Sequence, residues 1–127
     1  MAYRVLVVED EGIIAMMLSR MLERLGCTVL ATIDNSDDAE VFFSREYPDL
    51  VFMDIQINGS KNGIELAKSL VRQQPGARVI FLSANTDQTT RDAALSVKPM
   101  AFLPKPVEVD DLANVLRAMD QAGTQHA

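Results

Sequence analysis

Three apolar runs of this sequence each lead into side chains that could take part in chemistry. Asp54 follows the first of these runs, Glu9 and Asp10 follow a second, and Ser83 follows a third. Polar groups at the carboxyl ends of parallel strands line the ligand crevice of an open α/β sheet. Carboxylate oxygens are the hard ligands that Mg²⁺ prefers, and one or two carboxylates are enough to hold it. If the runs are parallel strands, the sequence predicts one shared site that could bind magnesium.

The elements that must position these side chains alternate along the chain. Short runs rich in β-branched residues are separated by longer stretches of helical period. This alternation predicts βαβ units and a parallel sheet, and therefore an α/β fold. Strands are expected at residues 4–8, 28–33, 50–53, 79–82 and 100–103, and helices between them and after the last strand.

Residues at the element boundaries refine this prediction. Ser36 is interpreted as the N-cap of the second helix, whose first turn carries Asp37 and Asp38. Asp87 is interpreted as the N-cap of the fourth helix, expected at about residues 88–97. Pro104 cannot donate to a strand ladder, so the fifth strand is expected at an edge of the sheet.

Length and composition limit the classes of protein. The 127 residues fit a single domain, taken as residues 1–121 and followed by a short polar tail at 122–127. Hydrophobic residues make up 48% and charged residues 24%, which is typical of an ordinary globular protein rather than a disordered one. The net charge of −6 argues against nucleic acid or anionic membrane as a partner and favours proteins or cations.

Cys27 is the single cysteine, which excludes an internal disulfide and favours a reducing compartment. We interpret Cys27 as a small buried hydrophobic residue. No apolar stretch reaches the roughly 20 residues of a spanning helix, and the N-terminus has no secretory pattern. A cytoplasmic location is therefore expected.

The five units with these polar strand ends resemble the receiver domain of bacterial response regulators, the CheY-like family. The resemblance covers about residues 4–119, and it implies a flavodoxin-like (βα)5 doubly wound parallel sheet with strand order 2-1-3-4-5. Four motifs, in the expected order, carry it: Val7-Val8-Glu9-Asp10-Glu11, Asp49-Leu50-Val51-Phe52-Met53-Asp54-Ile55, Phe81-Leu82-Ser83-Ala84 and Ala101-Phe102-Leu103-Pro104-Lys105-Pro106.

The resemblance also implies a ligand set for Mg²⁺. Asp10 and Asp54 would bind the metal directly, the backbone carbonyl of Gln56 would add a third ligand, and Glu9 would act through water. Neighbouring parallel strands lie about 4.8 Å apart, so carboxylates at the ends of strands one and three would converge on one cation.

By the same resemblance, Asp54 is the nucleophile that accepts a phosphoryl group from a histidine kinase or phosphotransferase. Lys105 would neutralise developing charge, and Ser83 would bind a phosphoryl oxygen. The Lys105-Pro106 peptide bond would be cis. The family further implies that movement of Ser83 is coupled to Phe102 on the fifth strand, although plain core packing of Phe102 is the simpler interpretation.

The resemblance implies a role in two-component signal transduction. Phosphorylation would change the surface of helix four, strand five and helix five, which a downstream protein would read. A stand-alone receiver of this kind, without direct DNA binding, could alternatively drain phosphate from a kinase. It would be a monomer or a phosphorylation-dependent dimer. His126, the only histidine, lies in the tail, so the chain does not resemble a histidine phosphocarrier.

Two alternatives remain at this stage. A pseudo-receiver would keep the fold as a binding module without being phosphorylated. A phosphohydrolase of the haloacid-dehalogenase type would place a second aspartate two residues after the nucleophile, where this chain has Gln56. No external substrate is therefore expected. The loop after Asp54 also departs from the common family pattern, because Asn58 stands at the usual proline and Gly63 comes one residue late. The path of this loop is therefore not predicted from the sequence.

Overall fold

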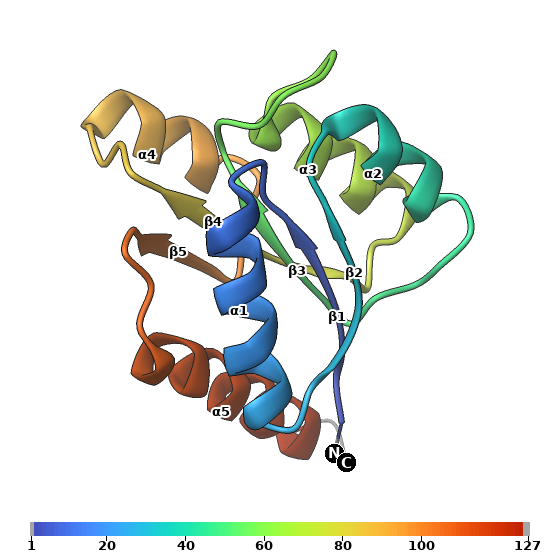
Figure 1. Cartoon of the computed structure of the whole chain (residues 1–127), viewed down its shortest axis with the longest axis vertical. Helices are drawn as coiled ribbons and strands as arrows, with labels where there is room; N and C mark the ends of the chain where they lie inside the picture. The colour runs from blue at the N-terminus through green and yellow to red at the C-terminus, as the bar shows by residue number, and fades with distance from the viewer. Residues whose placement is uncertain (1, 126–127) are drawn as a thin grey trace.

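The computed structural model describes residues 2–125, in which strands and helices alternate from one end to the other (Figure 1). The elements are β1 (Arg4–Val8), α1 (Gly12–Arg24), β2 (Thr28–Ile33), α2 (Ser36–Phe43), β3 (Leu50–Asp54), α3 (Gly63–Gln73), β4 (Arg78–Ser83), α4 (Gln88–Leu95), β5 (Ala101–Pro104) and α5 (Val109–Gln125).

The five strands form one parallel sheet in the order β2-β1-β3-β4-β5. This is the predicted flavodoxin-like order, in which the chain reverses direction across the sheet between β1 and β3. Pro104 pairs with Ser83 on β4, and within residues 2–125 β5 ends the strand order, so it is an edge strand as predicted. The register places Val8 beside Met53, which brings the carboxyl ends of β1 and β3 together.

Helices cover both faces of the sheet, which explains why its central strands are apolar at nearly every position. Side chains alternate between the two faces, and each set packs into its own core. Against α1 and α5 lie Val5, Val7, Leu50, Phe52, Ile80 and Leu82. Against α2, α3 and α4 lie Leu6, Val8, Val51, Met53, Val79 and Phe81.

Three helix ends differ from the sequence prediction: the start of α2, the end of α4 and the end of α5. Ser36 was wrongly assigned as the N-cap of α2, because Asn35 takes that position and its side chain accepts a hydrogen bond from the Asp38 amide at 2.8 Å. α4 ends at Leu95 rather than near residue 97. α5 continues to Gln125, into the polar tail predicted at residues 122–127. The Asp87 cap of α4 is confirmed by its hydrogen bond from the Thr90 amide at 2.8 Å.

Three further expectations concern single residues or segments. Cys27 is buried with 8% of its surface exposed, as predicted. Within residues 2–125 every helix is too short or too polar to cross a membrane. His126 lies outside the described residues.

Candidate functional site

The period of the strands directs two carboxylates to the same place. Glu9 continues the alternation of Val5 and Val7, and its amide still donates to the Ile33 carbonyl at 2.9 Å, as in a strand. Asp54 continues the alternation of the β3 residues that pack against α1 and α5. Both side chains therefore belong to the α1 and α5 face, at the ends of neighbouring strands. The predicted meeting of these carboxylates has a simple geometric cause.

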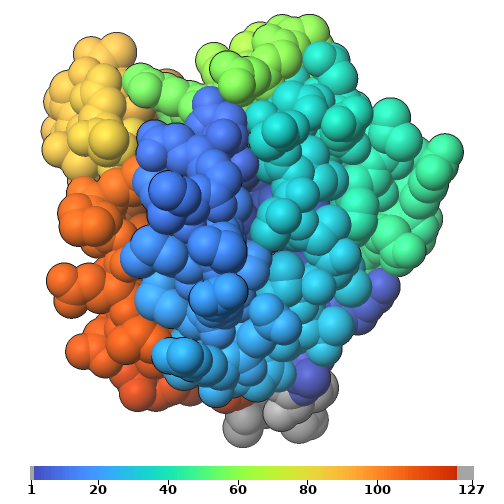
Figure 2. Space-filling model, viewed as in Figure 1, coloured from blue at the N-terminus to red at the C-terminus, as the bar shows by residue number. Residues whose placement is uncertain are grey.

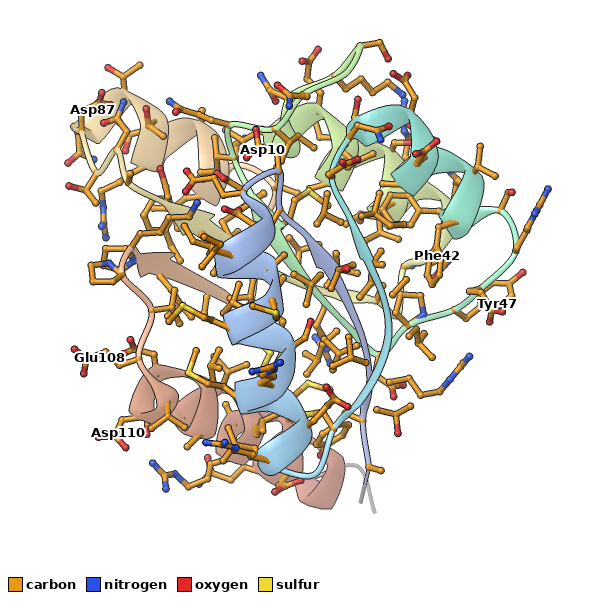
Figure 3. The ribbon with its side chains drawn as sticks, in the orientation of Figure 1. Asp10, Phe42, Tyr47, Asp87, Glu108 and Asp110 are labelled. Atoms are coloured by element: carbon orange, nitrogen blue, oxygen red, sulfur yellow. The ribbon has the colours of Figure 1, made fainter. Side chains whose placement is uncertain are left out.

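Asp10 completes an acidic cluster at the carboxyl ends of β1 and β3. Figure 3 shows it where the chain turns from β1 into α1. Glu9, Asp10 and Asp54 each offer one carboxylate oxygen, and these oxygens all lie within 4.8 Å of one another. Glu9 is 1% exposed and Asp54 is 5% exposed. Three oxygens at this spacing form a donor set that a small hard cation can bridge.

Lys105 reaches into the cluster from the end of β5. Its ammonium donates to Asp54 Oδ2 at 2.8 Å and to Glu9 Oε1 and Oε2 at 2.8 and 3.2 Å. Its backbone amide donates to the Ser83 carbonyl at 2.9 Å, which fixes the start of the segment after β5. The Lys105-Pro106 bond is cis, as expected. Lys105 is therefore the counter-ion of two buried carboxylates.

The charges in this cluster do not balance. Three carboxylates meet one ammonium, and burial raises the pKa of Glu9 to about 7, with a hydrogen bond to Asp54 adding to the effect. Burial alone would lower the pKa of Lys105, but its hydrogen bonds with Asp54 and Glu9 outweigh burial, so its pKa is raised. Burial is the largest cause of the Glu9 shift, and the neighbouring Asp54 carboxylate adds to it. The donor set thus fits a divalent cation in both its atoms and its charge.

Ser83 is the last residue of β4, and the hydrogen bonds of its hydroxyl are made within its own segment. It is 1% exposed, its hydroxyl donates to the Asn85 carbonyl at 2.7 Å, and it accepts from the Asn85 amide at 3.0 Å. This local turn satisfies the buried hydroxyl. Contacts between Ser83 and a phosphoryl group therefore remain a prediction.

Phe102 is half-buried on β5, where it pairs with Phe81 in the sheet and packs against the core on the α2, α3 and α4 face. The guanidinium carbon of Arg91 on α4 lies 5.1 Å from the centre of its ring, within the range of a cation–π contact. Sequence reasoning missed Arg91, because only the folded chain places α4 over β5. Core packing of Phe102 is confirmed, and its role as a switch stays a prediction.

The segment after Asp54 follows a path that the sequence left open. The Gln56 amide donates to Asp54 Oδ1 at 2.9 Å, so both carboxylate oxygens of Asp54 accept a hydrogen bond. Gly63 starts α3 directly on the Asp54 backbone, since an added Cβ would lie 2.2 Å from the Asp54 carbonyl oxygen. Gly63 comes one residue later than in the common family pattern, but it still makes this close contact with the Asp54 backbone. The additional residue therefore lies in the loop between Asp54 and Gly63.

Comparisons with known proteins agree with this geometry. The family description "Response regulator receiver domain" matches residues 5–117. The chemotaxis protein CheY of Bacillus subtilis is 31% identical over 121 residues, which cover 95% of this chain and 98% of that protein. The alkaline phosphatase synthesis transcriptional regulatory protein SphR of Synechococcus elongatus is 32% identical over 93% of this chain, which spans about half (49%) of its length. The signal receiver domain of a modulated diguanylate cyclase from Desulfovibrio desulfuricans has 29% identity and a TM-score of 0.88, with 100% of both chains covered.

Proposed function

This chain belongs to the response regulator receiver domain family, and on that premise we propose that Asp54 accepts a phosphoryl group from a histidine kinase or histidine phosphotransferase. One observation carries the proposal. Asp54 is buried and hydrogen-bonded to Lys105 inside a cluster of three carboxylates. A capping or solubilising aspartate has no need of such surroundings, whereas a phosphoryl acceptor needs both a nucleophilic carboxylate and nearby positive charge.

The donor set supports magnesium as the resident ion. Asp10 and Asp54 would hold it, together with the backbone carbonyl of Gln56, and Glu9 would contribute through water. When bound, Mg²⁺ neutralises negative charge on the transferring phosphoryl group. The support from this chain is the meeting of three carboxylate oxygens within 4.8 Å of one another, with Lys105 as the cation paired with two of them.

The residues of the chain divide the remaining work. One carboxylate oxygen of Asp54 forms a bond to the donor's phosphorus as the phosphorus–nitrogen bond breaks, and the electron pair of that bond leaves with the donor imidazole. Lys105 changes its hydrogen bond from the Asp54 carboxylate to a phosphoryl oxygen and stabilises its charge. The Gln56 amide keeps the carboxylate oriented for in-line attack.

The response to phosphorylation begins at Ser83. Its hydroxyl gives up the Asn85 carbonyl and donates to a phosphoryl oxygen, which draws the β4–α4 segment toward Asp54. Phe102 and Arg91 join β5 to α4, so the surface of α4, β5 and α5 shifts with that segment. A downstream protein would read this surface, or the chain would serve as a phosphate sink. The family resemblance and these contacts together support this response.

Intact-mass spectrometry after incubation with acetyl phosphate and magnesium tests the proposal. The wild type should gain the mass of one phosphoryl group, and it should not do so with EDTA. Asp54→Asn should gain none, because an amide is a poor nucleophile. Asp110→Asn is the matched control, since it makes the same change at an exposed residue of α5 and should react like the wild type.

A different result would favour the pseudo-receiver alternative. If the wild type binds magnesium but gains no phosphate from acetyl phosphate, phosphoramidate or a phosphorylated histidine protein, Asp54 is a structural or metal-binding residue only. If Asp54→Asn gains phosphate as fast as the wild type, the acceptor is another residue.

A further inference from the structure

The loop between Asp54 and α3 is bound to the start of α2 through backbone contacts. The Ser36 amide donates to the Asn58 carbonyl at 2.9 Å, and the Lys61 amide donates to Ser36 Oγ at 3.0 Å. Asn35 and Asn58 also form an isolated parallel bridge. Ser36 is completely buried. The Ser36 hydroxyl therefore binds the loop, while Asn35 caps α2.

Charged side chains of α2 add a second set of contacts. The Asp37 carboxylate accepts hydrogen bonds from Ser60 Oγ at 2.6 Å and from the Ser60 amide at 3.3 Å. Glu40 forms an ion pair with Lys61 and accepts a hydrogen bond from Ser69 Oγ at 2.9 Å. Burial raises the pKa of Glu40, but the bonds from Lys61 and Ser69 outweigh burial and lower it overall. Three residues on the first turns of α2 thus bind two consecutive loop residues.

Gly59 allows the loop to approach this closely. Its φ of +118° is a conformation that side chains with a Cβ rarely adopt. An added Cβ would lie 2.3 Å from Ser36 Oγ and 2.8 Å from the Ser36 amide nitrogen. Figure 2 shows the loop, in green, against the first part of α2, in cyan. The path of the loop therefore depends on contact with α2.

The same loop begins at the phosphoryl site. Gln56 donates its amide to Asp54, and its carbonyl is a proposed metal ligand. Residues 58–61 are held by α2 on one side, and Gly63 is pressed against the Asp54 backbone on the other. Gln56 lies between Asp54, at the end of β3, and residues 58–61, which α2 holds, so both ends of its short segment are fixed.

We propose that Ser36, Asp37 and Glu40 are positioning residues that hold the Gln56 backbone in place and thereby set the magnesium affinity of the Asp54 site. The proposal rests on the proposed function, since it takes the Gln56 carbonyl to be a metal ligand. Residues that orient a metal ligand commonly change metal affinity about 10- to 100-fold when replaced. Asp37 lies outside the core and provides the cleanest test.

Two substitutions at Asp37 separate its hydrogen bonds from its charge. Asp37→Ala removes the acceptor for Ser60, whereas Asp37→Asn keeps one oxygen that can accept the Ser60 hydroxyl. Ser44→Ala is the matched control, because Ser44 lies on the C-terminal side of α2 and bonds only locally, to the Val41 carbonyl at 2.6 Å. Gly59→Ala is a stronger test that displaces the loop by steric contact.

Calorimetric titration with magnesium alone should give about tenfold weaker binding for Asp37→Ala. Asp37→Asn should recover most of that loss, and Ser44→Ala should match the wild type. In phosphorylation by acetyl phosphate, the magnesium concentration for half-maximal rate should rise in Asp37→Ala, while the rate at saturating magnesium stays unchanged. A merely structural role would lower melting temperature without this split.

The outcomes distinguish this proposal from the proposed function. If the wild type neither binds magnesium nor gains phosphate, the proposed function fails. If the wild type does both, and folded Asp37→Ala and Gly59→Ala bind magnesium as tightly as it does, the positioning proposal fails alone. An equal loss in Asp37→Asn and Asp37→Ala would assign the effect to charge and also overturn the proposal.

Discussion

Replacing Glu9 by glutamine tests whether ionising this buried carboxyl beside Asp54 costs stability. Glu9 is almost fully buried beside Asp54, and its pKa is raised from the ordinary 4.5 to about 7. In the folded protein Glu9 keeps its proton up to about pH 7, while the unfolded chain releases it near pH 4.5. The contribution of Glu9 to stability is therefore fully present below about pH 4.5 and is lost as pH rises through 7.

The size of this loss follows from the pKa change. One pKa unit corresponds to about 1.4 kcal/mol, so the rise to about 7 corresponds to a loss of about 3 kcal/mol. Domains of this size have total unfolding free energies of about 5–15 kcal/mol, so the change is measurable. Glutamine cannot ionise and should not show this loss. We expect Glu9→Gln to gain about 3 kcal/mol relative to the wild type between pH 4.5 and pH 8, without magnesium.

Urea denaturation followed by circular dichroism, with EDTA at several pH values, measures this difference. Glu11→Gln is the control, because it makes the same change of charge at an exposed position two residues away. Adding magnesium at pH 8 should raise the unfolding free energy of the wild type by about 2.7 kcal/mol when its concentration is 100 times the wild-type dissociation constant. The same magnesium concentration should raise the unfolding free energy of Glu9→Gln by less. If the unfolding free energies of wild type and Glu9→Gln stay parallel across this pH range, the raised pKa of Glu9 inferred from its burial beside Asp54 is wrong.

Three further predictions concern other parts of the molecule. Lys98 has a φ of 57° just beyond α4, a conformation that glycine adopts more readily, so Lys98→Gly should raise the unfolding free energy by about 0.5–1 kcal/mol. Lys68→Gly inside α3 is the control and should lower the unfolding free energy by about 1 kcal/mol. Urea denaturation measures both changes. Burial raises the pKa of the Cys27 thiol, so a disulfide reagent should modify it slowly until urea unfolds the protein. The hydrogen bond from Tyr3 to Asp120 raises the pKa of Tyr3 to about 12, so its folding contribution is present below about pH 10 and is lost as pH rises through 12; ultraviolet titration should show a lower pKa in Asp120→Asn.

Much of the fold could be predicted because its signals are local. Apolar runs, helical periods and Pro104 at the end of the last strand indicated the elements and placed β5 at an edge, and the structure has both. The strand order came from family resemblance, since the order of parallel strands depends on long connections that local patterns do not encode. The carboxylate cluster could be inferred from strand ends and that order.

Features that depend on contacts between distant segments could not be predicted. Asn35 and Ser36 are both good capping residues, and nothing in their types shows which one caps α2. The choice follows from the loop, because Ser36 Oγ accepts a hydrogen bond from Lys61, 25 residues later. The bond of Ser83 to Asn85 and the stacking of Arg91 on Phe102 likewise depend on the folded backbone. A one-residue difference in the loop was visible, but the contacts that accommodate it were not.

The two edges of the sheet differ in their capacity to recruit another chain. β5 has four residues and ends in Pro104, whose nitrogen cannot donate to an additional strand. β2 has six residues, Thr28–Ile33, none of them proline. Unpaired strand edges are templates for aggregation, and those that end in proline are protected. When the protein is partly unfolded by heat or mild denaturant, we therefore expect intermolecular strand pairing to begin at β2. A charged substitution on β2 should reduce aggregation of the protein during storage more than one on β5.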